Sequence, residues 1–273
     1  MTQHSSPTPK DDTPLVRLET DRGVATITLD SPRNRNALSA RLRSELSEAL
    51  FEAMADEAVR AVVLTGSGPV FCAGADLKEA AAALAGEPVD QAPELPEIFE
   101  QIMGAPKPVV AVLNGAARAG GIGLVAAADI ALAPQGATFA FTEVRIGVVP
   151  AIISVPVSAR MHSRQLSRYF LTGEAFDAST AAEAGLITRA VPEEEMAHAL
   201  DEVLEGIRAS APRALSRTKE LLGELGAGAL AAPGRRREAF SRMGELSAEF
   251  FASEDAVEGR MSFFEKRPPR WAE

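Results

Sequence analysis

Hydrophobic and polar positions change their spacing along the chain, and each change marks a new element. Residues 16–19 and 23–29 alternate apolar and polar side chains, which is typical of β-strands with one buried face. From Ser39 onward, Leu42, Leu46 and Leu50 recur at helical spacing, and Ser39 is well placed to cap that helix. The pattern therefore predicts two strands followed by a helix.

Two short, continuous apolar runs, at residues 61–64 and 108–113, predict strands that are buried on both faces. Each run is followed by a turn rich in glycine and alanine and then by an alanine-rich helix. We also expect short strands at 130–133 and 138–141, an irregular connection at 86–96, and a mainly helical chain from about residue 152. Strands mixed with helices, followed by a helical last third, predict an α/β fold with a helical C-terminal region.

The chain has 273 residues, of which 46% are apolar, so it can bury a substantial core. Residues 1–13 are polar and lack periodicity, which predicts a mobile tail. We expect a core domain over residues 14–205 and a helical region over residues 206–273.

Charge and cysteine content exclude several classes of protein. The 28 Lys and Arg residues against 38 Asp and Glu give a net charge of −10, which argues against a broad nucleic-acid footprint. There is no signal-peptide pattern and no long apolar stretch, so we expect a soluble, cytoplasmic protein without membrane contacts. The single cysteine, Cys72, and three histidines show no ligand spacing, so no metal site is expected.

The glycine-rich turn at residues 115–123 has three possible explanations. A phosphate-binding P-loop is excluded, because Gly120 is not followed by lysine and then serine or threonine. The looser dinucleotide fingerprint is matched by Gly121, Gly123 and Ala126, but these residues lie too far beyond the preceding strand. Close packing between a helix and a strand is the third explanation. A turn of this kind can also present backbone N–H groups to negative charge at a helix start.

Several sequence segments, in chain order, resemble the crotonase (enoyl-CoA hydratase/isomerase) superfamily. They are residues 31–38, 71–77, 114–123, 141–150, 171–192 and 258–267, so the resemblance covers about residues 16–267. It implies a crotonase-like spiral of ββα units. It also implies a homotrimer, or a hexamer made of two trimers, in which residues 206–273 supply much of the contact.

Members of that superfamily bind acyl-CoA thioesters and stabilise an enolate-like thioester oxygen with two backbone amides. The resemblance places these amides at Ala75 and Gly120 and a catalytic carboxyl at Glu143. Taken alone, a glutamate before an apolar run is more often a solvated side chain; the resemblance makes Glu143 the candidate acid. Burial in an apolar pocket would raise its pKa and suit it to proton transfer near neutral pH.

One position departs from the pattern of the family. The family's second catalytic glutamate matches Gly123 in this chain, and a glycine cannot activate water. Three interpretations remain: Glu143 handles both proton and water, another acid such as Glu94 or Glu97 reaches in, or the reaction needs no water. Similarity to bacterial hydratases of the methylglutaconyl-CoA type favours an enoyl-CoA hydratase. The alternatives are a Δ3,Δ2-enoyl-CoA isomerase that uses Glu143 alone and a non-catalytic acyl-CoA-binding paralogue.

The resemblance also implies where CoA binds, along an early turn and beside the first amide donor. The expected CoA-binding residues are Arg33, Arg35, Ala37, Ala73, Asp76, Leu77, Phe263 and Lys266. Asp76 also fits the N-cap of the helix that begins at Leu77. Phe263 and Lys266 would approach CoA bound to a neighbouring subunit. Since CoA is part of the substrate, no separate cofactor is expected.

Overall fold

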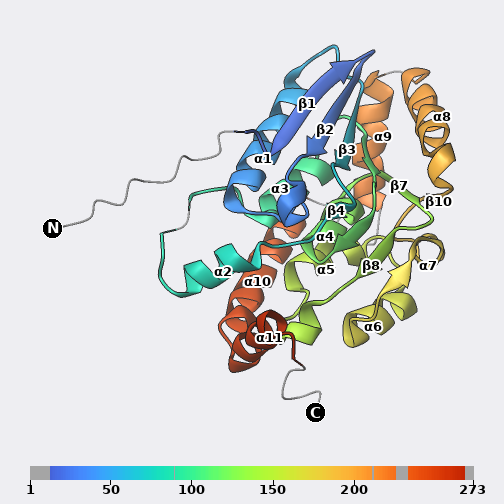
Figure 1. Cartoon of the computed structure of the whole chain (residues 1–273). Coiled ribbons are helices and arrows are strands. Elements are labelled where there is room, and N and C mark those ends of the chain that lie inside the picture. Colours follow the sequence, from blue (N-terminus) through green and yellow to red (C-terminus); the bar gives the residue numbers. More distant parts are fainter. Residues whose placement is uncertain (1–12, 89, 211, 226–232, 268–273) are drawn as a thin grey trace.

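The computed structural model describes residues 13–88, 90–210, 212–225 and 233–267 and has an α/β fold (Figure 1). The fold class predicted from the sequence is therefore confirmed. Of the tail expected over residues 1–13, only Thr13 lies within the described residues.

A six-stranded sheet forms the centre of the molecule, with the order β1-β2-β3-β5-β7-β10. Its strands are β1 (Val16–Asp21), β2 (Val24–Leu29), β3 (Ala61–Gly66), β5 (Val109–Val112), β7 (Ile130–Pro134) and β10 (Arg189–Val191). β1 pairs with β2 in the antiparallel direction, and all the other pairs are parallel. The strands expected at residues 16–19, 23–29, 61–64 and 108–113 all belong to this sheet.

A second sheet has the order β4-β6-β8-β9. Its strands are β4 (Val70–Cys72), β6 (Ala116–Arg118), β8 (Thr138–Ala140) and β9 (Phe176–Asp177). β4, β6 and β8 are parallel, whereas β9 runs antiparallel to β8. The chain repeatedly places one strand in the large sheet, the next in the small sheet, and then a helix. This order confirms the spiral of ββα units.

Helices cover both faces of the large sheet (Figure 1). Their bounds are α1 (Ala40–Ala55), α2 (Leu77–Leu84), α3 (Leu95–Met103), α4 (Gly120–Ala127), α5 (Ala151–Ser158), α6 (Ser163–Thr172), α7 (Ala178–Glu183), α8 (Met196–Arg208), α9 (Pro212–Leu225), α10 (Pro233–Phe251) and α11 (Glu254–Glu265). α1, α3 and α4 share one core with residues such as Ile27 and Leu64, and α8 and α9 pack with Val63 and Val110 on the other face. Ser39 caps α1 by accepting a hydrogen bond from the amide of Leu42.

The C-terminal helices are tied to the core by partly buried ion pairs. Lys219 of α9 lies 2.7 Å from the carboxylate of Asp129, and Arg236 of α10 lies 3.2 Å from that of Glu100. In Figure 1, α10 and α11 lie below the large sheet, and α10 lies beside α5. None of the helices within the described residues is long and apolar enough to cross a membrane.

Helix α3 was not expected from the sequence. The connection predicted to be irregular over residues 86–96 ends at Glu94, because Leu95 begins this helix. Pro96 lies in the first turn, where a missing backbone N–H costs nothing. The carboxylate of Glu97 accepts a hydrogen bond of 2.8 Å from the amide of Glu94 and so caps the helix start.

Candidate functional site

Three adjacent parallel strands of the small sheet end at the same edge, and a candidate site residue follows each of them. Ala75 comes three residues after β4, Gly120 two residues after β6, and Glu143 three residues after β8. Ligands of open α/β sheets bind preferentially outside the carboxyl ends of the strands. The topology therefore brings three residues that are distant in sequence to one edge of this sheet.

The segments that carry Ala75 and Gly120 are in direct contact. Gly74 has a φ of +87°, and a Cβ atom placed there would lie only 2.8 Å from the Cβ of Ala119 and 3.3 Å from the amide nitrogen of Gly120. Ala119 itself has a φ of +45°, which is a strained conformation for alanine. A side chain at Gly74 would push the two candidate amide donors apart.

Both candidate amides lack a hydrogen-bond acceptor within the described residues. Gly120 is the first residue of α4, so its N–H has no acceptor within the helix. Within the described residues, neither this amide nor that of Ala75 donates a hydrogen bond. Two N–H groups of this kind can stabilise negative charge on a carbonyl oxygen.

Glu143 begins a short 3-10 turn, η2 (Glu143–Ile146). Its Oε2 atom is buried and has no hydrogen-bond partner within the described residues. Burial raises the pKa of Glu143 to about 7, which confirms the rise expected from the sequence. The carboxyl can therefore take up and release a proton near neutral pH.

The other side of the η2 turn is packed against α11. A Cβ atom at Gly259 would lie 2.2 Å from the carbonyl oxygen of Ile146, so the helix touches the backbone of the turn. Ser253, which caps α11, also donates a hydrogen bond of 3.5 Å to the carbonyl oxygen of Gly147. The C-terminal helix thus supports the segment that holds Glu143.

A cavity of about 560 Å³ opens beside Ala75. It is lined by Leu38, by residues of α2, and by the connection that precedes α3. Glu94 lies in its wall, whereas the carboxylate of Glu97 is used in capping α3. Of the two additional acids considered from the sequence, Glu94 is the one that reaches this cavity.

The ring of Phe99 occupies the space that a side chain at position 123 would need. A Cβ atom on Gly123 would lie 2.3 Å from Cζ of Phe99 and 2.9 Å from Cε2. One turn earlier in each helix, a Cβ atom on Gly120 would meet Leu95 at 3.2 Å. The apolar face of α3 therefore occupies the space in which a second acidic side chain on α4 would lie.

Phe99 and Leu95 were missed by the sequence analysis, although a signal for them exists. Leu95, Ile98, Phe99 and Ile102 recur at helical spacing, and Glu94 and Glu97 form a capping pair at the start of this pattern. The prolines at 93 and 96 had suggested an irregular segment instead.

The expected CoA-binding residues fall on three segments. Arg33 and Arg35 are exposed at η1 (Pro32–Asn34) and just after it, and Ala37 is buried beyond them. Ala73 and Leu77 are partly buried on either side of Ala75.

Asp76 caps α2, because its Oδ1 accepts hydrogen bonds from the amides of Lys78 and Glu79 at 3.0 and 3.2 Å. A contact with CoA would use its other oxygen. Phe263 and Lys266 are exposed at the end of α11. Their expected role concerns a neighbouring subunit and stays a prediction.

Neither a reactive thiol nor a cluster of metal ligands is found within the described residues. Cys72 is fully buried, and burial raises its pKa to about 12, so it carries no reactive thiolate. In the part of the chain that the structure describes, no three His, Cys, Asp or Glu side chains are grouped so that they could hold a metal ion.

Comparison with known proteins gives consistent matches over almost the whole chain. A family model described as enoyl-CoA hydratase/isomerase matches residues 19–273. A crystal structure of an enoyl-CoA hydratase from Mycobacterium avium shares 40% identity with a TM-score of 0.82, covering 94% of this chain and 98% of that one. A protein from Rhodobacter capsulatus named "Probable enoyl-CoA hydratase" is 34% identical over 94% of this chain and 97% of its own length. A carnitinyl-CoA dehydratase from Proteus mirabilis is 31% identical, with coverage of 94% and 97%.

Proposed function

Since the chain belongs to the enoyl-CoA hydratase/isomerase family, we propose that it is an enoyl-CoA hydratase that adds water reversibly to a 2-enoyl-CoA thioester. The observation that carries this proposal is the buried Oε2 atom of Glu143, which has no hydrogen-bond partner within the described residues and lies at the sheet edge that also carries the amides of Ala75 and Gly120. Two amide donors and one acid with a pKa near 7 are what proton transfer beside a thioester carbonyl needs.

The proposed reaction uses Glu143 for both proton transfers. Its carboxylate takes a proton from water while the oxygen of that water bonds to C3 of the substrate. The electron pair of the C2–C3 double bond moves to the thioester oxygen, which accepts hydrogen bonds from Ala75 and Gly120. Protonated Glu143 then delivers its proton to C2, and the thioester carbonyl forms again. The capping role of Glu97 and the packing at Gly123 support this assignment.

The activity is tested by supplying crotonyl-CoA and 3-methylglutaconyl-CoA and following the absorbance of the conjugated enoyl thioester. A hydratase removes this absorbance and forms a 3-hydroxyacyl-CoA. Binding of both thioesters without product would instead support the acyl-CoA-binding paralogue.

An isomerase is the second candidate, and the packing of Phe99 against Gly123 favours it, because moving a proton between C4 and C2 needs only one carboxylate. The test supplies a 3-enoyl-CoA. Accumulation of the 2-enoyl product without hydration would replace the first proposal by this one.

The pH dependence follows from the raised pKa of Glu143. Hydration consumes no net proton, so the same protonation state of the enzyme must act in both directions, and in this mechanism it is the carboxylate. We expect kcat/KM to rise about tenfold per pH unit below pH 7 and to level off above it. The check is a profile from pH 5 to 9 with crotonyl-CoA; a midpoint near 4.5 would contradict a desolvated Glu143.

We also propose assembly into a homotrimer or a hexamer. Apolar side chains are exposed along α11 at helical spacing, at Val257, Met261 and Phe264, each between 46% and 50% exposed. Light scattering should give the mass of three or six chains, and Phe264→Lys should reduce that mass. Leu171→Lys is the matched control, because Leu171 is 79% exposed on α6. Equal effects of the two variants would contradict a role of α11.

A further inference from the structure

Asn36 is a buried polar residue for which the proposed mechanism has no role. Its side chain is fully buried, whereas its neighbours Arg35 and Arg33 are exposed. Its φ of +55° places it in the left-handed region, which asparagine tolerates better than most residues. A fully buried amide in this conformation persists only if its surroundings satisfy it.

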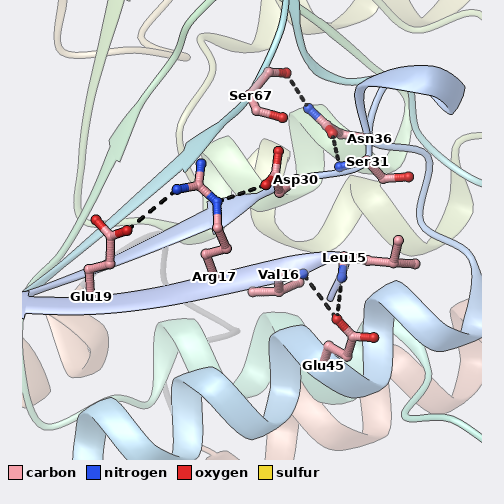
Figure 2. Close-up of polar contacts among 9 residues, drawn as sticks. All are labelled: Leu15, Val16, Arg17, Glu19, Asp30, Ser31, Asn36, Glu45 and Ser67. Carbon is pink, nitrogen blue, oxygen red and sulfur yellow. Dashed lines mark hydrogen bonds and ion pairs between the residues drawn. The ribbon is translucent and has the colours of Figure 1, made fainter. Parts of the chain in front are cut away.

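The side chain of Asn36 joins three segments of the chain. Its Oδ1 accepts a hydrogen bond of 2.8 Å from the amide of Ser31, and its Nδ2 lies 3.0 Å from the carbonyl oxygen of Ser67 (Figure 2). The same Nδ2 donates to the carbonyl oxygens of Val70 and Phe71 at 2.9 and 3.1 Å. One side chain thus holds the turn after β2, the turn after β3, and strand β4.

The contacts around Asn36 continue directly to the first candidate amide. The amide of Ala73 donates to the carbonyl oxygen of Arg35 at 3.0 Å, and the amide of Leu38 donates to that of Gly74 at 2.8 Å. Leu38 also forms a parallel bridge with Ala75. Residues 35–38 therefore run beside residues 71–75, and Asn36 lies at the start of this pairing.

We propose that Asn36 is a positioning residue that couples the turn at residues 31–37 to the direction of the Ala75 amide. This inference rests on the proposed function, because it requires that Ala75 binds the thioester oxygen. The carbonyl groups of Val70 and Phe71, to which Nδ2 donates, precede Ala75 by five and four residues, so a shift of β4 moves the amide relative to Gly120. A displacement of about 1 Å at such a site can cost about 100-fold in rate.

The test uses two variants and one matched control. Asn36→Gly keeps the left-handed backbone and removes all four side-chain contacts. Asn36→Asp keeps the acceptor for Ser31 but replaces the donating NH2 by an oxygen. Asn114→Ala is the control, because its Nδ2 also donates a hydrogen bond to this region, to the carbonyl oxygen of Gly68, but forms no hydrogen bond with β4 within the described residues.

The readouts are kcat and KM with crotonyl-CoA, and the near-ultraviolet absorbance of the enolate of bound acetoacetyl-CoA as a function of pH. The enolate forms at lower pH when two amides bind its oxygen, so this signal reports the amides without turnover. For Asn36→Gly and Asn36→Asp we expect kcat to fall at least about tenfold with KM changed less than about threefold. The enolate should need a pH about one unit higher, and Asn114→Ala should leave both readouts within about twofold of the wild type.

Unchanged kcat and enolate absorbance in a folded Asn36 variant would overturn this inference and leave the proposed function standing. An equal loss of kcat in Asn114→Ala would do the same. Folding is checked by circular dichroism, and Asn36→Asp serves if Asn36→Gly is unfolded. If both Asn36 variants are unfolded while Asn114→Ala folds and is active, Asn36 is a stability residue and the inference fails. If the wild-type protein binds no acyl-CoA, the proposed function fails, and this inference fails with it.

Discussion

We expect Glu143→Gln to lower kcat at least about 100-fold while acyl-CoA binding is retained, since acid–base groups contribute about 100-fold to 10,000-fold. Glutamine has nearly the same shape as glutamate but cannot transfer a proton. Steady-state kinetics with crotonyl-CoA, together with calorimetric titration of a non-reactive acyl-CoA, separates the loss of rate from a loss of binding.

Glu94→Gln is the matched control for this variant, because Glu94 is an acid that lines the cavity beside Ala75. We expect it to retain most of the rate. A large loss in Glu94→Gln with none in Glu143→Gln would transfer the catalytic role to Glu94. An unchanged rate in both variants would exclude acid–base catalysis by either carboxyl.

The same Glu143→Gln substitution should stabilise the fold at high pH. The pKa of Glu143 lies near 7 in the folded chain against an ordinary value of 4.5, so the unfolded chain ionises first as pH rises. Glu143 therefore lowers the free energy of unfolding as the pH rises. This loss of stability is absent below pH 4.5, grows between pH 4.5 and 7, and stays constant at about 3 kcal/mol above pH 7. Denaturant unfolding should show a gain for the variant at pH 8 and none at pH 4.5.

The second large effect is expected for Gly123→Glu, which would introduce the missing second acid. The ring of Phe99 lies where the new side chain must begin, and both helices are packed in the core. Overpacking together with burial of a carboxyl should lower the free energy of unfolding by about 3 kcal/mol or more. The urea midpoint measures this loss, and a midpoint equal to that of the wild type would show that the ring moves aside freely.

The double variant Phe99→Ala with Gly123→Glu separates packing from chemistry. Removing the ring provides room, so we expect the double variant to be more stable than Gly123→Glu alone. If it also hydrates crotonyl-CoA faster than Phe99→Ala, then water activation limits the native enzyme. If the double variant is no more stable than Gly123→Glu, the clash with Phe99 is not the cause of the instability.

The sequence predicted the elements whose signals are local. Alternating and continuous apolar runs identified the strands of the large sheet, and Ser39 and Asp76 were recognisable as helix caps. The raised pKa of Glu143 was expected only because the family resemblance placed this carboxyl in an apolar pocket. The roles of Ala75, Gly120 and Glu143 came from the family resemblance, since no spacing in the sequence links them.

The remaining features depend on contacts that a linear pattern does not contain. β4 and β6 are only three residues long and lie next to or within glycine-rich segments, so neither shows an alternation of apolar and polar residues that would predict a strand. Helix α4 was expected from its alanine-rich sequence, but its burial on all sides was not. The close approach of Phe99 to Gly123, and of Asn36 to β4, joins segments 24 to 35 residues apart, which only the folded chain brings together.

The contact between Gly259 and Ile146 has a consequence for how the protein is made. The turn that holds Glu143 leaves the ribosome about a hundred residues before the helix that supports it. Both sheets can pair while this support is still being synthesised. We therefore expect a chain that ends near residue 250 to form both sheets but to lack the support of the turn that holds Glu143, and so to lose the proposed activity.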